Sequence, residues 1–117
     1  MKQTLADALG KLVGNELSSV TFVRDYVQLA FDGPSMHAYT TPSVACGSEV
    51  LSLGQPGYRD VLCKEIGCRV ERTEVDNQRL SIVFENGVAV SISLRDEDYR
   101  GPEALRFSLD DKCDWVV

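Results

Sequence analysis

The sequence predicts an α+β domain in which antiparallel β-hairpins form most of the structure and two short helices accompany them. Three observations predict this class. Apolar residues alternate with polar residues over several short runs, Gly- and Pro-containing turn signals separate these runs, and two segments have helical periodicity instead. The length of 117 residues and the 44% hydrophobic content fit one domain over residues 1–117.

The first predicted element is a helix that begins after Thr4. Thr4 is suited to the N-cap position, with Asp7 three residues later, and Gly14 is a suitable stop because it tolerates a positive φ. The apolar residues of this segment recur at intervals of three and four and form one stripe, made of Leu5, Ala8, Leu9, Leu12 and Val13.

Alternating segments then predict an antiparallel meander. Three strands are expected, at residues 19–23, 27–31 and 36–41, with a strong turn signal at 32–35 between the last two. Residues 42–57 read as an irregular connection that has room for a short strand around Val50 and Leu51. A second helix is predicted over residues 56–66, ended by Gly67.

The second half of the sequence is again typical of strands. The pair Asn86-Gly87 predicts a type I′ hairpin turn with positive φ at both residues, and Asp76-Asn77 predicts another turn. The expected strands are 68–75, 80–85, 88–94, 105–109 and 115–117. The resulting order, α-β-β-β-α-β-β-β-β-β, favours a mostly antiparallel sheet with helices on one face, and a strongly curved or barrel-like sheet stays open as an alternative.

The net charge of the chain restricts the classes of partner that it is expected to bind. Eighteen acidic residues against 12 basic ones give a formal net charge of -6, which disfavours nucleic acid and anionic membranes and favours a basic protein. Asp7 interrupts any early apolar run of the kind an export signal needs, and no apolar stretch approaches the ~20 residues of a membrane span. We therefore expect a cytoplasmic protein whose cysteines are free thiols.

Neither a metal site nor a cofactor is predicted. The cysteines are Cys46, Cys63, Cys68 and Cys113, and only Cys63 and Cys68 are near each other in sequence. A structural zinc site typically needs a second close pair of ligands, so buried free thiols that act as small apolar residues are the favoured interpretation. The sequence does not exclude metal binding by Cys63 and Cys68.

No catalytic residue is predicted either. His37 is the only histidine, and its alternating position beside Tyr39 favours a ring packed on a sheet face. A role as general base for Cys46 or for a serine stays open, because sequence does not show such contacts. The chain has no phosphate-binding Gly-rich loop, paired-His helix or nucleophile elbow.

Two acidic segments are the predicted partner-binding residues. One contains Asp96, Glu97 and Asp98, and the other contains Asp110 and Asp111. If both lay at one end of the sheet, they would form a single negative patch suited to a basic partner.

Several segments resemble small bacterial proteins, largely uncharacterised, some of which are labelled immunity proteins of polymorphic toxin systems. The resemblance lies in Gly57-Tyr58-Arg59-Asp60, in the hairpin around Asn86-Gly87 and in residues 93–104. It implies a cytoplasmic protein that binds and blocks a toxin made by its own cell, and it assigns no contact residues.

The resulting functional hypothesis is a non-enzymatic protein-binding domain, an immunity-type inhibitor that occludes a basic bacterial toxin. Two other classes stay open: a small-ligand or metal-binding module, and a structural homodimeric domain. An enzyme that uses His37 with a cysteine is the least favoured hypothesis.

Overall fold

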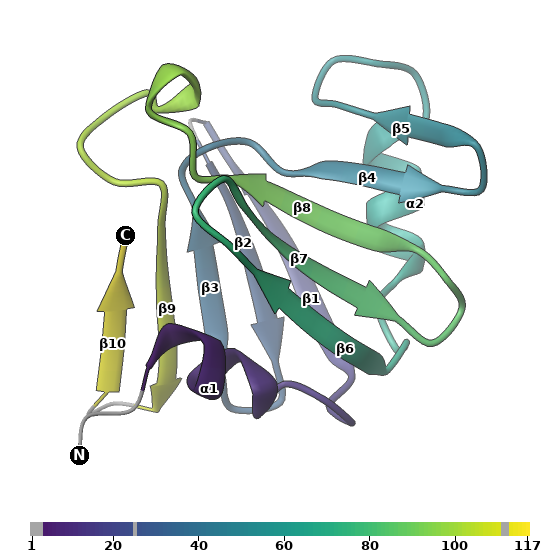
Figure 1. Ribbon diagram of the computed structural model, residues 1–117. Helices are drawn as coiled ribbons and strands as arrows, with labels where there is room; N and C mark the ends of the chain where they lie inside the picture. Colours follow the sequence, from purple (N-terminus) through teal and green to yellow (C-terminus); the bar gives the residue numbers. More distant parts are fainter. Residues whose placement is uncertain (1–3, 25, 111–112) are drawn as a thin grey trace.

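The computed structural model describes residues 4–24, 26–110 and 113–117 and confirms the α+β class. Within these ranges the chain forms two five-stranded antiparallel sheets that pack face to face, with their strands running obliquely to each other (Figure 1). The sheets are not closed into a barrel. The strand order along the chain is close to the predicted one, but the strands divide between two layers where a single sheet was expected.

The first sheet has the order β1-β2-β3-β9-β10 and joins the two distant parts of the chain. The predicted meander forms its first three strands, and the C-terminal hairpin adds the other two. Its strands are β1 (Leu17–Val23), β2 (Tyr26–Phe31), β3 (Ser35–Ala38), β9 (Leu105–Asp110) and β10 (Cys113–Val116).

The second sheet has the order β5-β4-β8-β7-β6. Its strands are β4 (Ser43–Cys46), β5 (Glu49–Leu51), β6 (Val70–Val75), β7 (Arg79–Phe84) and β8 (Ala89–Ser93). The hairpin β4–β5 lies in the segment where the sequence predicted an irregular connection. Gly47, at φ 64°, and Ser48 form its two-residue turn, and such a Gly-Ser pair between short β-compatible runs is a hairpin signal in itself.

The two helices occupy the regions that the oblique packing leaves uncovered. Helix α1 (Leu5–Gly10) lies beside edge strand β6 in front of the first sheet, and helix α2 (Tyr58–Lys64) packs against β4 and β1 (Figure 1). The predicted cap is present, because the Thr4 hydroxyl accepts a 3.1 Å hydrogen bond from the Asp7 amide. No helix in the described ranges has the length and apolar character needed to cross a membrane.

The turn at Asn86-Gly87 differs from the prediction. Gly87 has a φ of 91°, but no residue other than glycine has a positive φ in the described part of the chain, so the turn is not of type I′. A three-residue loop forms instead, closed by a 2.9 Å hydrogen bond from the Phe84 amide to the Val88 carbonyl. The Asn86 side chain accepts a hydrogen bond from the Val88 amide and donates one to Glu65, and these bonds hold Asn86 in the loop.

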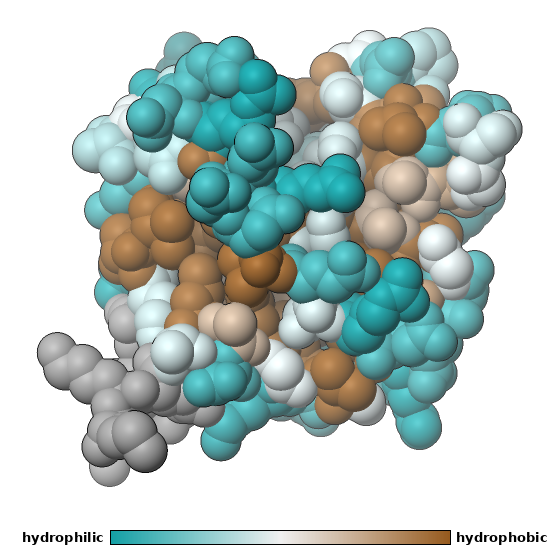
Figure 2. All heavy atoms as spheres, viewed as in Figure 1, coloured by the Kyte–Doolittle hydropathy of each residue, from teal (hydrophilic) through white to brown (hydrophobic). Residues whose placement is uncertain are grey.

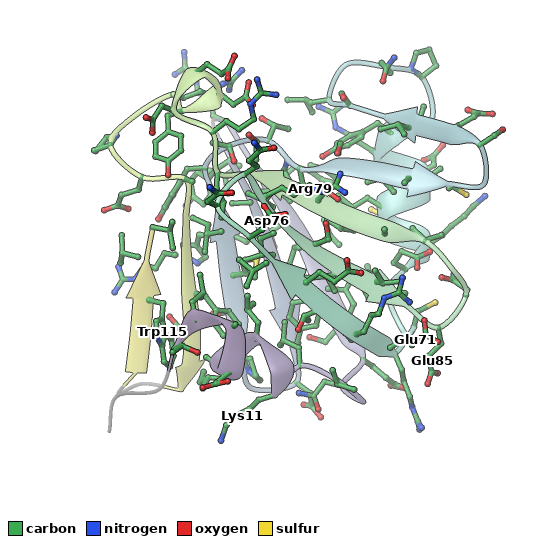
Figure 3. All side chains as sticks on the ribbon, in the orientation of Figure 1. Lys11, Glu71, Asp76, Arg79, Glu85 and Trp115 are labelled. Atoms are coloured by element: carbon green, nitrogen blue, oxygen red, sulfur yellow. The ribbon has the colours of Figure 1, made fainter. Side chains whose placement is uncertain are left out.

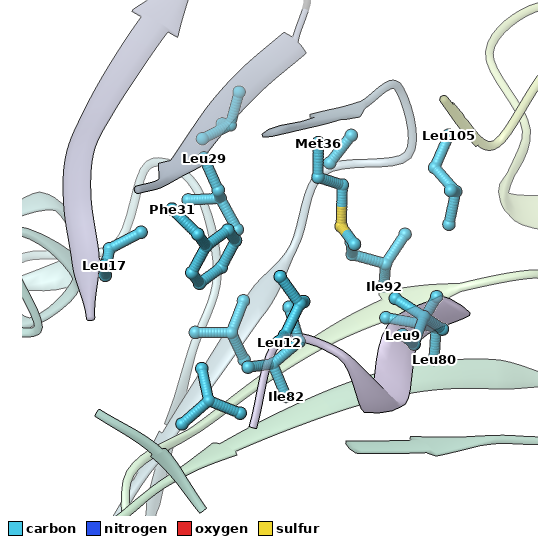
Figure 4. Packing of buried hydrophobic residues seen from close by; sticks show 14 of the residues in the cluster. Leu9, Leu12, Leu17, Leu29, Phe31, Met36, Leu80, Ile82, Ile92 and Leu105 are labelled. Carbon is cyan, nitrogen blue, oxygen red and sulfur yellow. The ribbon is translucent and has the colours of Figure 1, made fainter. Parts of the chain in front are cut away.

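The core lies between the two sheets and includes both helices. Strands β2, β3 and β8 alternate strictly between buried and half-buried residues, as the period-2 pattern predicts. Figure 4 shows Phe31 and Met36 of the first sheet facing Ile82 and Ile92 of the second, with Leu9 and Leu12 of α1 in the same cluster. The side chains on the inner face of each sheet are thus buried in the core. The outer faces are the surfaces that a binding partner can reach.

The chain crosses between the sheets at one corner, residues 39–42, between β3 and β4. The Thr40 hydroxyl donates a 2.8 Å hydrogen bond to the Ser93 carbonyl at the end of β8, and the amides of Tyr39 and Thr40 donate to the Ala104 carbonyl. The corner is therefore bonded to both ends of the segment that leads from β8 to β9. This segment contains the 3-10 helix η1 (Asp96–Asp98).

Candidate functional site

Three aromatic side chains form a cluster on the outer face of the first sheet. The ring of Tyr26 lies 5.7 Å from that of His37 and 5.3 Å from that of Tyr39, and the His37 and Tyr39 rings are 6.4 Å apart and nearly perpendicular. All three side chains are only partly buried. We call Tyr26, His37 and Tyr39 the aromatic cluster.

Strand alternation brings these rings together. Tyr26 and Gln28 are outward positions of β2, and His37 is paired directly with Gln28 across β2 and β3. The Gln28 amide donates a 3.1 Å hydrogen bond to the Tyr26 hydroxyl, which orients that ring. On the other side of β3, His37 is paired with Arg106 of β9. Sequence analysis singled out His37 beside Tyr39 but missed Tyr26, whose outward position next to them follows from the β2–β3 register.

His37 lies on a sheet face between tyrosine rings, which agrees with the packed arrangement expected from the sequence. In the described part of the chain, His37 forms no hydrogen bond to a thiol. Cys46 is exposed at the end of β4 in the other sheet, and Cys63 is exposed on α2. Among described residues, no group of three or more His, Cys, Asp or Glu side chains is placed to hold a metal ion.

An open hollow of about 550 Å³ adjoins the aromatic cluster. It lies between Tyr39 and the loop that follows η1, and its lining residues are Tyr39, Arg100, Gly101, Pro102 and Glu103. Tyr39 thus contributes to both the cluster and the hollow, so the two features form one continuous surface.

The first predicted acidic segment lies in η1, next to this hollow in the chain. Its charges are partly compensated, since Arg95 forms a 2.6 Å ion pair with Glu97, and Asp98 accepts a 2.5 Å hydrogen bond from the Ser93 hydroxyl. Asp96 is exposed and forms no ion pair with the other residues that the structure describes. The negative charge of this segment therefore comes mainly from Asp96, with a smaller contribution from the partly compensated carboxylate of Glu97.

The second acidic segment lies elsewhere. Asp110 ends β9 at the opposite end of that strand from η1 (Figure 1), and Asp111 lies outside the described residues. With six residues at about 3.3 Å each, β9 separates the two segments by roughly 20 Å. The backbone at Asp110 therefore does not lie at the same end of the sheet as η1, and η1 is the segment that adjoins the aromatic cluster and its hollow.

A second hollow lies on the outer face of the second sheet. It has a volume of about 640 Å³ and is bordered by three arginines, Arg79, Arg95 and Arg100. Arg79 is distant in sequence from Arg95 and Arg100, and the β7–β8 register brings it to the segment that contains the other two. No local pattern in the sequence indicates this site.

Comparison with known proteins found no relative of this chain. No family model, no curated protein and no solved structure matches it.

Proposed function

We propose that this chain is a non-enzymatic protein-binding domain that acts as an immunity-type inhibitor and occludes a bacterial toxin. The observation that carries the proposal is the aromatic cluster of Tyr26, His37 and Tyr39 on the outer face of the first sheet. Large rings held together on a sheet face, with an arginine beside them, have the composition of an interface hot spot.

The cluster is suited to binding because its rings already restrict one another. A tyrosine has few rotatable bonds, and here each ring is held by ring contacts or by the Gln28 hydrogen bond. Association therefore costs less side-chain entropy than it would for long flexible residues on an open surface. The adjoining hollow beside Tyr39 offers a place for one side chain of the partner.

Charge favours a basic partner. The chain has a formal net charge of -6, and Asp96, Glu97 and Glu103 lie in the segment that borders this surface. Such charges mainly accelerate encounter with a cationic protein, while the aromatic contacts slow dissociation. The mechanism would be occlusion of the toxin's active cleft by a rigid sheet surface, with no chemical step on this chain.

The test is binding to the purified toxin encoded by the neighbouring upstream gene, measured by surface plasmon resonance. We expect Tyr39→Ala to weaken affinity by at least about tenfold, which corresponds to ~1.4 kcal/mol, through faster dissociation. Asp96→Asn should lower the association rate and leave dissociation unchanged. The matched control is Arg72→Ala, an exposed residue of the other sheet, which should change neither rate.

Two results would contradict the proposal. One is the absence of binding between the wild-type chain and that toxin. The other is full affinity in a Tyr26→Ala/Tyr39→Ala variant that circular dichroism shows to be folded, because the interface would then lie on another surface.

A further inference from the structure

The hollow bordered by the arginines forms a polar groove on the outer face of the second sheet. We call it the arginine groove. It extends from the β3–β4 corner across the end of β8 to the β6–β7 turn. Figure 2 shows this face, where hydrophilic residues gather around η1 and towards the centre, and Figure 3 labels Asp76 and Arg79 at the β6–β7 turn. Its lining residues are Thr40, Thr41, Ser43, Asp76, Gln78, Arg79, Ser91, Ser93, Arg95, Asp98 and Arg100.

The carboxylates of this groove are already engaged by the protein. Asp76 accepts hydrogen bonds of 2.7 and 2.9 Å from the amides of Gln78 and Arg79, and these bonds hold its pKa below the ordinary value. Asp98 accepts from the Ser93 hydroxyl. The carboxylates of Asp76 and Asp98 therefore stabilise the turns that border the groove.

The guanidinium groups, in contrast, retain free donors. Within the described residues, the Arg79 and Arg100 side chains form no hydrogen bond or ion pair, and only Arg95 is paired, with Glu97 at the rim. An exposed pair of this kind is worth at most about 1 kcal/mol, so a stronger acceptor can displace Glu97. The groove thus offers the guanidinium groups of Arg79 and Arg100, and that of Arg95 once Glu97 is displaced.

The local charge is less negative than that of the whole chain. Three guanidinium groups face the carboxylates of Asp76, Asp98 and the rim residue Glu97, so the groove is close to neutral on a chain whose formal net charge is -6. The floor consists of short hydroxyl side chains: Ser43 and Ser91 are paired across β4 and β8, and Ser93 is paired with Arg79 across β8 and β7. Small residues there leave room for a ligand to approach the sheet, although the hydroxyls of Ser91 and Ser93 are already hydrogen-bonded to Ser81 and Asp98.

These features select a class of ligand. The lining contains no aliphatic or aromatic side chain, so an apolar molecule gains nothing there. The net charge of the chain repels a long polyanion such as nucleic acid. The volume is in the range of small-molecule sites, and a phosphate group has the charge and the oxygen geometry that guanidinium forks match.

We infer that the arginine groove binds a small hydrophilic molecule that carries a phosphate group, with Arg79, Arg95 and Arg100 as the oxyanion ligands. This site lies on the outer face of the second sheet and shares Arg100 with the hollow beside Tyr39, whereas the aromatic cluster itself lies on the outer face of the first sheet.

Isothermal titration of the full chain with inorganic phosphate, glucose 6-phosphate, glucose and citrate tests the inference. We expect saturable binding of both phosphate compounds, tighter for glucose 6-phosphate, and none for glucose. Arg79→Ala should weaken phosphate binding at least about fivefold, and Arg79→Lys should lie between it and the wild type, because lysine keeps the charge and loses the fork. Arg72→Ala is the matched control on the same sheet face, outside the groove, and should bind as the wild type does.

Three outcomes would overturn the inference: no phosphate binding up to about 10 mM, unchanged binding in folded Arg79→Ala, or binding of citrate without binding of phosphate. Arg79 lies in the second sheet, whereas the rings of Tyr26 and His37 lie on the outer face of the first, so Arg79→Ala should leave toxin binding intact. A failure of the phosphate site therefore does not imply a failure of the proposed function, or the reverse.

Discussion

The hydroxyl group of Tyr58 donates a 2.6 Å hydrogen bond to the carbonyl oxygen of Pro42, in the interior of the protein. This bond connects the first turn of helix α2 to the corner through which the chain passes from the first sheet to the second. Tyr58 is 1% exposed, and its ring also contacts Phe22 of β1 edge-on, with 6.5 Å between the ring centres. One side chain thus links α2, the corner and the first sheet.

Tyr58→Phe is expected to destabilise the protein by about 1–2 kcal/mol, because it leaves the buried Pro42 carbonyl without this donor. Urea unfolding followed by circular dichroism measures the change. Since the ring remains, Tyr58→Ala should cost clearly more, and equal stability of wild type and Tyr58→Phe would contradict the role of the bond.

The same residue predicts how stability depends on alkaline pH. Burial raises the pKa of Tyr58 from its ordinary value of 10.0 to about 12, against a smaller lowering by Arg59. As the pH rises, the unfolded chain loses this proton first, so the stabilisation is complete below pH ~10 and is lost as the pH approaches ~12, by roughly 1–2 kcal/mol. The slope of stability against pH in this window should be smaller in Tyr58→Phe, and an identical slope would contradict the prediction.

Thr40→Val tests the other bond of the corner. The Thr40 side chain is 2% exposed and donates to the Ser93 carbonyl, so replacing its hydroxyl by a methyl group should destabilise the protein by about 1 kcal/mol. Thr21→Val, an exposed position of β1, is the control and should change the urea midpoint little. Thermal unfolding provides a second measurement, and a larger loss in the control would contradict the assignment.

Glu65 is a buried carboxylate with only one hydrogen-bonded oxygen. It is 2% exposed; Oε2 accepts a 3.1 Å bond from Asn86, and Oε1 has no partner among the described residues. Burying an incompletely paired charge costs free energy, so Glu65→Gln should stabilise the protein near neutral pH by about 1 kcal/mol. Glu65→Ala should destabilise it, because Asn86 then loses its acceptor. Chemical denaturation measures the free energy of unfolding of both variants. A Glu65→Gln variant less stable than the wild type would show that the charge itself is required.

Cys68 is expected to be the slowest of the three described thiols to react. Partial burial, and then the carboxylates of Glu65, Glu16 and Glu85, raise the pKa of its thiol, so less thiolate is present near neutral pH. Iodoacetamide should therefore modify Cys46 and Cys63 first, as followed by peptide mass spectrometry. Raising the pH, or introducing Glu85→Gln, should accelerate modification of Cys68. Preferential labelling of Cys68 at neutral pH would contradict this order.

Much of the secondary structure was predictable because it depends on local chemistry. The Thr4 cap, the strand runs and the positive φ of Gly67 follow from neighbouring residues, although helix α2 ends at Lys64, before the predicted stop at Gly67. Strand β5 lies where the sequence left room for a short strand around Val50 and Leu51, but its partner β4 was missed, because four residues are too few to display a period. The turn at Asn86 was predicted with the wrong geometry, because a tertiary hydrogen bond to Glu65 adds to its local preference.

The sequence by itself determined the α+β class, the hairpins and the place of His37 on a sheet face, since alternation and turn residues act over a few positions. Only the tertiary structure decided that the strands divide into two sheets, that Tyr26 meets His37 and Tyr39, and that Arg79, Arg95 and Arg100 border one groove. The physical reason is that strand register and sheet packing join residues far apart in the chain, and alternation along one strand does not specify its partner. The same reason places the acidic segments at 96–98 and 110 at opposite ends of β9.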